Sequence, residues 1–497
     1  MEHLDVLVVG AGLSGICAGH YLQAECPWAS YAVFEARGAT GGTWDLFRYP
    51  GIRSDSDMNT LGFGFRPWDQ EKTIADGASI LRYIRETATA EGIDANIRFH
   101  HRVVAAHWST PEACWHVTAE RGDTGETFEL TVGFLFSCTG YYRYDHGYQP
   151  DFEGVDDYRG TFVHPQHWPE DLDYEGKRIV VIGSGATAVT LIPALAERAA
   201  HVTMLQRSPT YIITMPDRYA TTAVLRRVLP RSIAPGVTRW ANALVTQAFY
   251  QVSRRRPKLV RRMLLRQVAR QLPKGYDVTT HFTPSYDPWD QRVCLVPGGD
   301  LFRAIRRGRA AVVTDHVDTF TSTGIRLRSG TELEADIVVS ATGLDLLFAG
   351  GMDVRVDGRP VEVSEKMMYK GMMLQDVPNM AVAIGYTNAS WTLKCELTCR
   401  YVARLLNHLH ERGLRQCTPV DHDTEITSSS VMGLSSGYVQ RAAHRLPKQG
   451  SRFPWQVHQS YLRDYRAMER TPVDDGTMEF TNPVPVPAPR RDPVRTR

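Results

Sequence analysis

Two glycine-rich segments of the chain have the spacing of dinucleotide-binding turns. The first, Gly10-Ala11-Gly12-Leu13-Ser14-Gly15, follows the strand-like run Leu4 to Val9 and precedes a helical pattern that runs toward Glu25. In such a turn the first glycine allows the bend, the second lets a pyrophosphate approach the backbone, and the third lets the helix pack on the strand. Free N–H groups at the helix N-terminus would then bind the phosphates. We therefore predict a dinucleotide site at this turn.

A second segment repeats this order later in the chain. A strand is predicted over Arg178 to Ile182, the turn Gly183-Ser184-Gly185-Ala186-Thr187-Ala188 follows it, and the next predicted strand covers Val202 to Leu205. The units differ after their second strand, where the first has Glu35 and the second has Arg207-Ser208. A carboxylate can hold two ribose hydroxyls, whereas Arg and Ser attract a 2′-phosphate. The first unit therefore suits FAD and the second NADPH. A solvated cation at a strand end is the alternative interpretation of Arg207.

The rest of the sequence limits what these two units can do. A chain of 497 residues is too long for one hydrophobic core, and its net charge of +2 gives no general affinity for nucleic acid. The eight cysteines form no C-x-x-C pair and no metal-ligand spacing, which fits a metal-free protein of the reducing cytoplasm. We expect no secretion signal and no membrane-spanning segment. Since no disulfide is available to be reduced, we expect dioxygen to accept the electrons that a flavin takes from NADPH.

Two further motifs carry a family resemblance. The run Gly41-Gly42-Thr43-Trp44-Asp45-Leu46-Phe47-Arg48-Tyr49-Pro50-Gly51-Ile52-Arg53-Ser54-Asp55 lies between the units, and Tyr158-Arg159-Gly160-Thr161-Phe162-Val163-His164-Pro165-Gln166-His167-Trp168-Pro169 lies just before the second unit. They resemble the two signatures of type I Baeyer–Villiger monooxygenases, except that Tyr158 stands where the family has Phe. Trp168-Pro169 favours this family over the related N- and S-oxidising flavin monooxygenases. The resemblance covers the chain up to about Asp474 and is greatest to the ethionamide-activating branch from mycobacteria.

The resemblance implies an FAD-containing, NADPH-dependent enzyme that converts ketones to esters or lactones through a flavin peroxide. It also implies oxidation of sulfur in thioethers or thioamides. For FAD and the nicotinamide side it implies contacts at Gly10, Gly12, Ser14, Gly15, Glu35, Thr43, Trp44, Asp45, Leu46, Arg53, Ser54, Asp55 and Val103. For NADP it implies contacts at Gly183, Ser184, Gly185, Ala186, Thr187, Ala188, Val189, Arg207 and Ser208. His164 resembles the signature histidine, which in the family lies near the domain linker and couples domain motion.

Arg292, in Trp289-Asp290-Gln291-Arg292, matches the active-site arginine of the family. A guanidinium fixed beside the reacting carbonyl would stabilise the negative charge that develops there, and it stays protonated when water is excluded. An acid beside it, which we expect to be Asp55, could orient it. We therefore predict Arg292 and Asp55 as catalytic residues. From residue chemistry alone, an interdomain salt bridge would be the simpler interpretation of Arg292.

The predicted fold class is α/β, with two Rossmann-like dinucleotide-binding domains and a helical insertion in the NADPH domain. Apolar strands that end in Thr-Gly, at residues 135–140 and 338–343, are expected to be the crossovers between the domains. The predicted segments are 1–145 and 381–474 for the FAD domain, 146–215 and 301–380 for the NADPH domain, 216–300 for the insertion, and 475–497 for a disordered tail rich in Pro and Arg. The insertion would shape the substrate cavity.

Within the insertion, residues 254–272 combine many arginines with Val260, Leu264, Val268 and Leu272 at helical spacing. Such a basic amphipathic helix could contact the inner face of the cell membrane. A packed helix with a solvated basic face explains the pattern equally well.

Three other functions remain open from the sequence. The chain could be an N- or S-oxygenating flavin monooxygenase, an NADPH oxidase without a true organic substrate, or a redox-sensing FAD protein that is not an enzyme. The complete second nucleotide unit disfavours the last of these.

Overall fold

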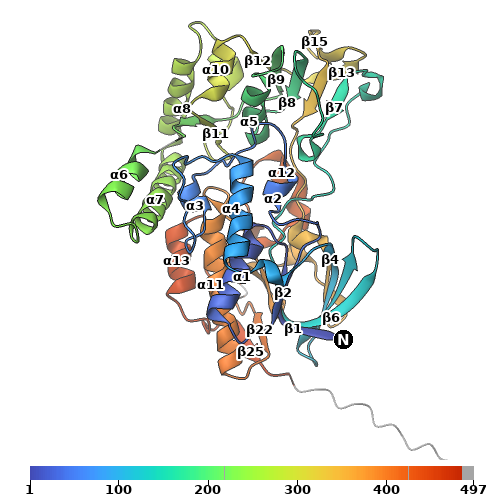
Figure 1. Ribbon diagram of the computed structural model, residues 1–497, viewed down its shortest axis with the longest axis vertical. Helices are drawn as coiled ribbons and strands as arrows, with labels where there is room; N and C mark the ends of the chain where they lie inside the picture. The colour runs from blue at the N-terminus through green and yellow to red at the C-terminus, as the bar shows by residue number, and fades with distance from the viewer. Residues whose placement is uncertain (218, 424, 484–497) are drawn as a thin grey trace, which may run out of the picture.

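The structure, a computed structural model, describes residues 1–217, 219–423 and 425–483. It contains two large β-sheets, which lie in the lower and upper halves of Figure 1. The lower sheet has nine strands in the order β18 (Arg359–Pro360), β17 (Asp353–Val356), β4 (His101–Ser109), β5 (Cys114–Arg121), β6 (Thr127–Ser137), β1 (Glu2–Val9), β2 (Tyr31–Phe34) and β3 (Ile97–Arg98), with β21 (Met380–Val382) paired to β6. The upper sheet has five parallel strands in the order β12 (Ala310–Thr314), β9 (His201–Gln206), β8 (Arg178–Ile182), β16 (Ile337–Ser340) and β7 (Thr161–Val163). The predicted α/β class is confirmed.

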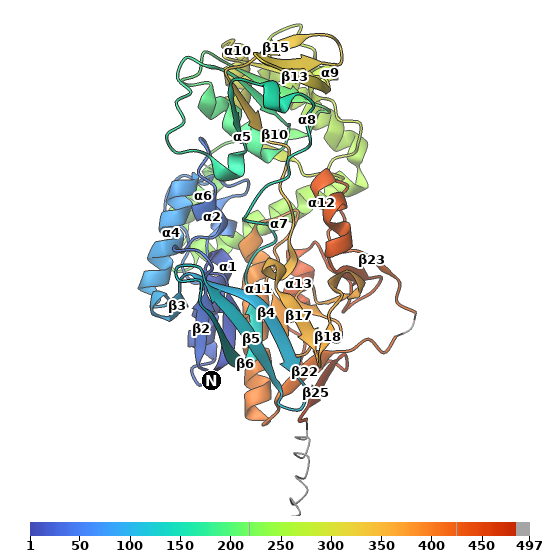
Figure 2. The same ribbon diagram turned by 90° about the vertical axis from the view of Figure 1, so that its right-hand side faces the viewer.

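Both faces of each sheet are covered by other elements. Since successive side chains of a strand point to opposite faces, one strand contributes residues to two separate cores. In β1, Val6 and Val8 join a core with α1 (Leu13–Glu25) and α11 (Trp391–Glu411), whereas Leu7 joins the core on the other face. Figure 2 shows the long strands β4, β5 and β6 crossing the lower half. In β8, Val181 shares a core with α5 (Ala186–Leu195), and Val180 packs toward the small sheet of β13 (Val317–Thr321), β14 (Gly324–Leu327) and β15 (Glu332–Glu334).

Outside the segment between residues 216 and 293, the remaining α-helices of the described chain are α2 (Thr43–Leu46), α3 (Met58–Leu61), α4 (Gly77–Ala90), α10 (Asp300–Arg306), α12 (Gly437–Ala442) and α13 (Tyr461–Glu469). Three further strand pairs are β19 (Met368–Tyr369) with β20 (Met373–Leu374), β22 (Gln416–Pro419) with β25 (Met478–Thr481), and β23 (Ser428–Ser430) with β24 (Lys448–Gly450).

The two glycine turns occupy equivalent places in their sheets. Gly10 follows β1 and donates its N–H to the carbonyl of Phe34 at 2.7 Å, and Gly183 follows β8 and donates to the carbonyl of Leu205 at 2.8 Å. Their φ angles, +105° and +136°, lie in the region that favours glycine. Both units therefore have the predicted order of strand, turn, helix and parallel strand.

A helical insertion lies between the paired strands β10 (Ile212–Met215) and β11 (Cys294–Pro297), at the left of Figure 1. Its helices are α6 (Ala220–Val228), α7 (Ala234–Arg255), α8 (Pro257–Gln271) and α9 (Val278–Phe282). Val260, Leu264 and Val268 of α8 are buried, and so is Leu272 just beyond it. The apolar face of α8, for which the sequence allowed a membrane contact, therefore packs against the protein. Across the described residues, no helix has the length and apolar character needed to span a bilayer.

Two segments differ from their sequence-based prediction. β17 pairs with β4, so the chain re-enters the nine-stranded sheet soon after β16 and well before residue 380. β25 pairs with β22, and Met478 within it is buried, so the prediction of a disordered tail is wrong for residues 475–483. A strand partner so far away in the sequence is not visible in local composition. Residues 484–497 lie outside the described part of the chain, and the assignment of segments to particular cofactors stays a prediction.

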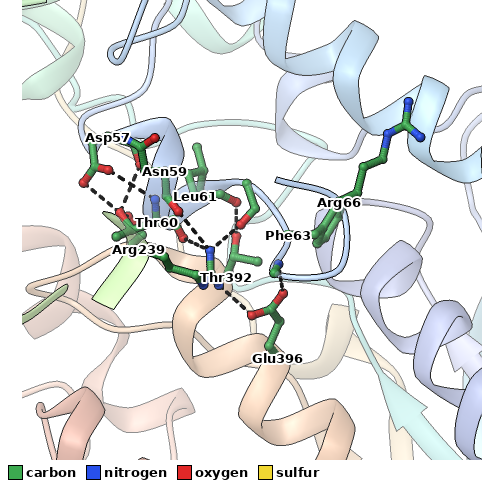
Figure 3. A network of polar contacts seen from close by, with 12 residues as sticks. Asp57, Asn59, Thr60, Leu61, Phe63, Arg66, Arg239, Thr392 and Glu396 are labelled. Atoms are coloured by element: carbon green, nitrogen blue, oxygen red, sulfur yellow. Dashed lines mark hydrogen bonds and ion pairs between the residues drawn. The ribbon is translucent and has the colours of Figure 1, made fainter. Parts of the chain in front are cut away.

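A buried ion pair attaches the insertion to the lower half of the molecule (Figure 3). Arg239 of α7 binds Glu396 of α11 with 2.6 Å between Nη2 and Oε2, and each side chain is about 10% exposed. Arg239 Nη1 also donates to the carbonyl of Thr60 at 3.0 Å, and the amide of Gly64 donates to Glu396. Because both charges are satisfied by fixed partners, the pair can be buried without a large cost.

Removing the charge of Arg239 alone should destabilise the protein more than removing the charges of both Arg239 and Glu396. We expect Arg239→Met to lower the free energy of unfolding by about 3–5 kcal/mol, because Glu396 is left as an unpaired buried carboxylate. The double variant Arg239→Met/Glu396→Met should recover part of that loss, measured as the urea midpoint of unfolding. Strictly additive losses in the double variant would contradict this account.

Candidate active site

A cavity of about 1130 Å³ lies between the two sheets, and both glycine turns line it. It opens at the carboxyl ends of the parallel strands β1 and β8, where ligands of such sheets usually bind. Asp55 and Arg292 also line it, so residues from both halves of the molecule face a common space.

The first turn presents backbone donors and one carboxylate to this cavity. Gly12 caps α1 and no side chain caps the helix, which leaves its N–H groups open to a ligand. A Cβ on Gly42 would lie 3.0 Å from the Cα of Gly12, so the two backbones can approach only without side chains. Glu35 accepts the amide of Ala11 at 2.8 Å and that of Arg37 at 3.0 Å. Burial raises the pKa of Glu35 despite these two hydrogen bonds.

The second turn leaves more open space. Apart from its two chain neighbours, no described residue lies within 4 Å of a Cβ built on Gly185, which caps α5 without help from a side chain. The hydroxyl of Ser184 donates to the carbonyl of Ser208 at 3.0 Å and so connects the turn to the end of β9. Arg207 and Ser208 are exposed and line the cavity, as expected for residues that meet a phosphate.

Arg292 and Asp55 meet at the wall of the cavity, with 2.9 Å between Nη2 and Oδ2. The charge of Asp55 raises the pKa of Arg292, and interactions with Tyr141, Tyr438 and Tyr142 raise it further. Burial raises the pKa of the Tyr142 phenol, which therefore stays neutral. The predicted pairing is thus present: a permanent positive charge is held in place by a carboxylate from another segment.

Most of the predicted site residues line the cavity. Five lie behind its wall: Gly15, Asp45, Leu46, Ala188 and Val189.

Besides Asp55, two of the predicted cofactor residues have ion-pair partners within the protein. Asp45 is buried and pairs with Arg37 and Arg85, each at 2.7 Å, which fixes the first signature segment. Arg53 lines the cavity, but its guanidinium pairs with Asp300. The ion pairs of Asp45 and Arg53 therefore hold together the segments that form the site.

His164 is not among the residues that line the cavity. Its Nδ1 accepts the amide of Gln166 at 3.2 Å, and burial lowers the pKa of His164, which keeps the ring neutral. A role in coupling domain motion stays a prediction.

Sequence reasoning missed Arg441 as a cavity residue. Arg441 of α12 lies with its Cζ 3.4 Å from the ring centroid of Tyr148, and both residues line the cavity. Its Nη2 is buried and has no hydrogen-bond partner among the described residues. Nothing in the local sequence singles out this arginine, because only the fold brings α12 beside the second unit.

Comparison with known proteins gives the family. The profile described as flavin-binding monooxygenase-like matches residues 69–414, and one described as an NAD(P)-binding Rossmann-like domain matches residues 8–72. The chain belongs to the flavin-binding monooxygenase-like family. This flavin monooxygenase is 54% identical over 487 residues to the FAD-containing monooxygenase EthA of Mycobacterium tuberculosis, covering 98% of this chain and 99% of that protein. It is 48% identical over 482 residues to the probable FAD-binding monooxygenase AlmA of Acinetobacter baylyi, with 96% of each chain covered.

Solved structures agree on the fold. Cyclohexanone monooxygenase bound to ε-caprolactone has a TM-score of 0.76 at 19% identity, covering 97% of this chain and 100% of that one. An oxidised steroid monooxygenase bound to NADP has a TM-score of 0.70 at 25% identity, covering 84% and 88% of the two chains. This flavin monooxygenase therefore shares its overall α/β fold with them.

The two turns of this flavin monooxygenase should respond differently to an added methyl group. A Cβ on Gly15 would overlap with the carbonyl oxygen of Gly10, whereas a Cβ on Gly185 meets nothing within 4 Å. We expect Gly15→Ala to cost about 1–3 kcal/mol of stability through overpacking. Gly185→Ala should leave the unfolding temperature of the cofactor-free protein unchanged. Equal unfolding temperatures for the two variants would contradict the difference in space.

Proposed function

We propose that this chain is a Baeyer–Villiger-type monooxygenase that contains FAD, uses NADPH and dioxygen, and converts ketones to esters or lactones. The Arg292–Asp55 pair carries the proposal, because it places a permanent positive charge in the cavity that both dinucleotide turns share. The balanced reaction consumes a ketone, dioxygen, NADPH and one proton, and it yields an ester, NADP⁺ and water. Bound together, the two cofactors would supply hydride transfer and dioxygen activation, which side chains cannot provide.

The residues present fit both cofactors. The uncapped helix end at Gly12 suits the pyrophosphate of FAD, and the fixed carboxylate of Glu35 suits its ribose hydroxyls. The open space at Gly185 suits the pyrophosphate of NADPH, and Arg207 with Ser208 suits its 2′-phosphate. The steroid monooxygenase with bound NADP supports the same choice of nicotinamide cofactor.

In this proposal Arg292 stabilises the negative charge that develops on the carbonyl oxygen of the ketone. Such a fixed charge acts strongly in a cavity from which water is excluded, because it needs no reorganisation during the reaction. Asp55 keeps the guanidinium in position, and Tyr141, Tyr142 and Tyr438 interact electrostatically with it. Oxygen transfer to nitrogen or sulfur creates no such carbonyl oxyanion, so the position of Arg292 favours the ketone reaction.

Oxidation of thioether or thioamide sulfur is the second activity that we propose for this site. A compound that carries both a ketone and a thioether separates the candidate reactions, since the ester and the sulfoxide are distinguished by NMR. Stoichiometric hydrogen peroxide with every compound would instead indicate an NADPH oxidase.

The arginine variant tests the proposed chemistry directly. We expect Arg292→Ala to keep NADPH oxidation and to lose ester formation by about 100- to 1000-fold, because the charge at the carbonyl oxygen is lost. Product yield and NADPH consumption should be measured together. Arg292→Lys is the matched control for charge and should restore only part of the yield, because Lys lacks the planar fork that Asp55 binds. Normal yield in Arg292→Ala would refute the assignment.

We also propose that Arg441 binds NADPH together with Arg207. Burial lowers the pKa of Arg441, whereas Tyr148 and Asp345 raise it, and the charge of Arg207 lowers it, so the two cations lie close enough to repel each other. A phosphate between them would remove that repulsion and satisfy the unpartnered Nη2.

Loss of Arg441 should therefore weaken the binding of the nicotinamide cofactor. We expect Arg441→Ala to raise the Kd for NADP⁺ by about 10- to 100-fold, as for one charge-assisted hydrogen bond. The measurement is calorimetric titration of the FAD-loaded protein with NADP⁺ and with NAD⁺. Arg207→Ala serves as the reference for a 2′-phosphate contact, since it should affect NADP⁺ alone. An unchanged NADP⁺ affinity in Arg441→Ala would remove Arg441 from the site.

We propose in addition that the enzyme works against an anionic membrane surface. The charge of the insertion supports this: residues 218–276 contain 14 lysines and arginines and no aspartate or glutamate, whereas the whole chain has a net charge of only +2. The remainder of the chain is therefore net negative, and the insertion alone would be attracted to acidic lipids.

A further inference from the structure

The insertion also concentrates exposed apolar side chains. Thirteen large hydrophobic residues are exposed in the described part of the chain, and nine of them lie between Val224 and Met263. Scattered single residues of this kind are ordinary on protein surfaces, but such a concentration is typical of a surface that binds a partner.

On α7 these residues form one outward stripe. Val237, Leu244, Val245 and Val252 are 39–67% exposed, and their spacing of seven or eight residues corresponds to two helical turns. The opposite side of α7 is held in the protein by the buried Arg239. The stripe therefore faces away from the body of the molecule, and burial against the protein does not explain it.

The neighbouring helices continue this pattern. Leu259 and Met263 of α8 are one turn apart and about half exposed, whereas Val260 and Leu264 beside them are buried. Val224 and Val228 of α6 are also one turn apart and exposed. Figure 1 shows the three helices together at the left edge, outside both sheets. We call the exposed apolar residues of α6, α7 and α8 the insertion surface.

Cations border the insertion surface. Arg255 lies one turn beyond Val252, while Arg262 and Arg266 lie one turn beyond Leu259 and Met263, and all three arginines are exposed. For these three, the described part of the chain offers no carboxylate partner at ion-pair distance. Aliphatic side chains among unpaired arginines are the combination found on helices that lie in the interface of an anionic bilayer.

We infer that the insertion surface docks on an anionic lipid bilayer. This deepens the proposed membrane contact and is independent of the oxygenation chemistry. A second copy of the chain is a poorer partner, because two acid-free surfaces would repel each other across a two-fold interface. A nucleic acid is also poorer, because single strands bind through aromatic stacking and the exposed hydrophobic residues of this surface are all aliphatic.

Vesicle flotation of the full-length, FAD-loaded protein tests the inference. One set of vesicles contains phosphatidylcholine alone, and the other contains phosphatidylcholine with phosphatidylglycerol. We expect binding to the anionic vesicles only. The variant Leu244→Ser/Val245→Ser/Leu259→Ser should lose binding by at least tenfold. The variant Arg255→Gln/Arg262→Gln/Arg266→Gln should lose about 100-fold, since each cation near such a surface contributes about fivefold.

The matched control removes three charges elsewhere. Arg328, Arg359 and Arg412 are exposed and lie outside the insertion, so Arg328→Gln/Arg359→Gln/Arg412→Gln should bind anionic vesicles like the natural protein. Unfolding temperatures show whether each variant is folded. No binding by the natural protein would overturn both the membrane contact and this surface. Full binding by both insertion variants would overturn the surface alone. If the serine variant dissociates an oligomer in sedimentation and keeps vesicle binding, the surface joins copies of the chain and the inference is wrong.

Discussion

Arg292 and Asp55 can meet only while two halves of the chain that share no β-sheet stay docked. Other ion pairs cross the same boundary, among them Arg53 with Asp300 and Arg239 with Glu396. In each of these three pairs a guanidinium binds a carboxylate, and one partner comes from residues 216–300. A half-buried charge without its partner is costly, so all three pairs oppose separation of the halves. Polar contacts of this kind nevertheless allow more rearrangement than a shared apolar core would.

The parts of the fold that depend on short stretches of sequence could be predicted. The glycine turns, the strands at Tyr31–Phe34 and Arg178–Ile182, and the helical nature of the insertion all follow from local spacing and apolar periodicity. The contrast between Glu35 and Arg207 was also visible, because both follow the second strand of their unit. Each of these features is determined by a stretch of about thirty residues, so it could be predicted without knowledge of the tertiary structure.

The features that could not be predicted from the sequence depend on contacts between residues that lie far apart in the chain. Trp391 donates to the hydroxyl of Ser14 at 2.8 Å across 377 positions, and Arg441 reaches Tyr148 from α12. The pairing of β25 with β22 has the same character, because a short strand without strong periodicity becomes ordered only beside its partner. The basic helix shows a related limit: its periodicity revealed that α8 has an apolar face, but not whether protein or lipid covers that face.

The crossovers between the halves form part of the nucleotide sites. Cys138 to Gly140 and Ala341 to Gly343 both line the cavity. A Cβ on Gly10 would lie 2.7 Å from the carbonyl oxygen of Cys138, and one on Gly183 would overlap with that of Ala341. Each turn is therefore pressed against the segment that carries the chain to the other half. Any change in how the halves dock must move these segments and alter both turns together. A dinucleotide that prefers the docked arrangement must, by the same linkage, stabilise the contact between Arg292 and Asp55.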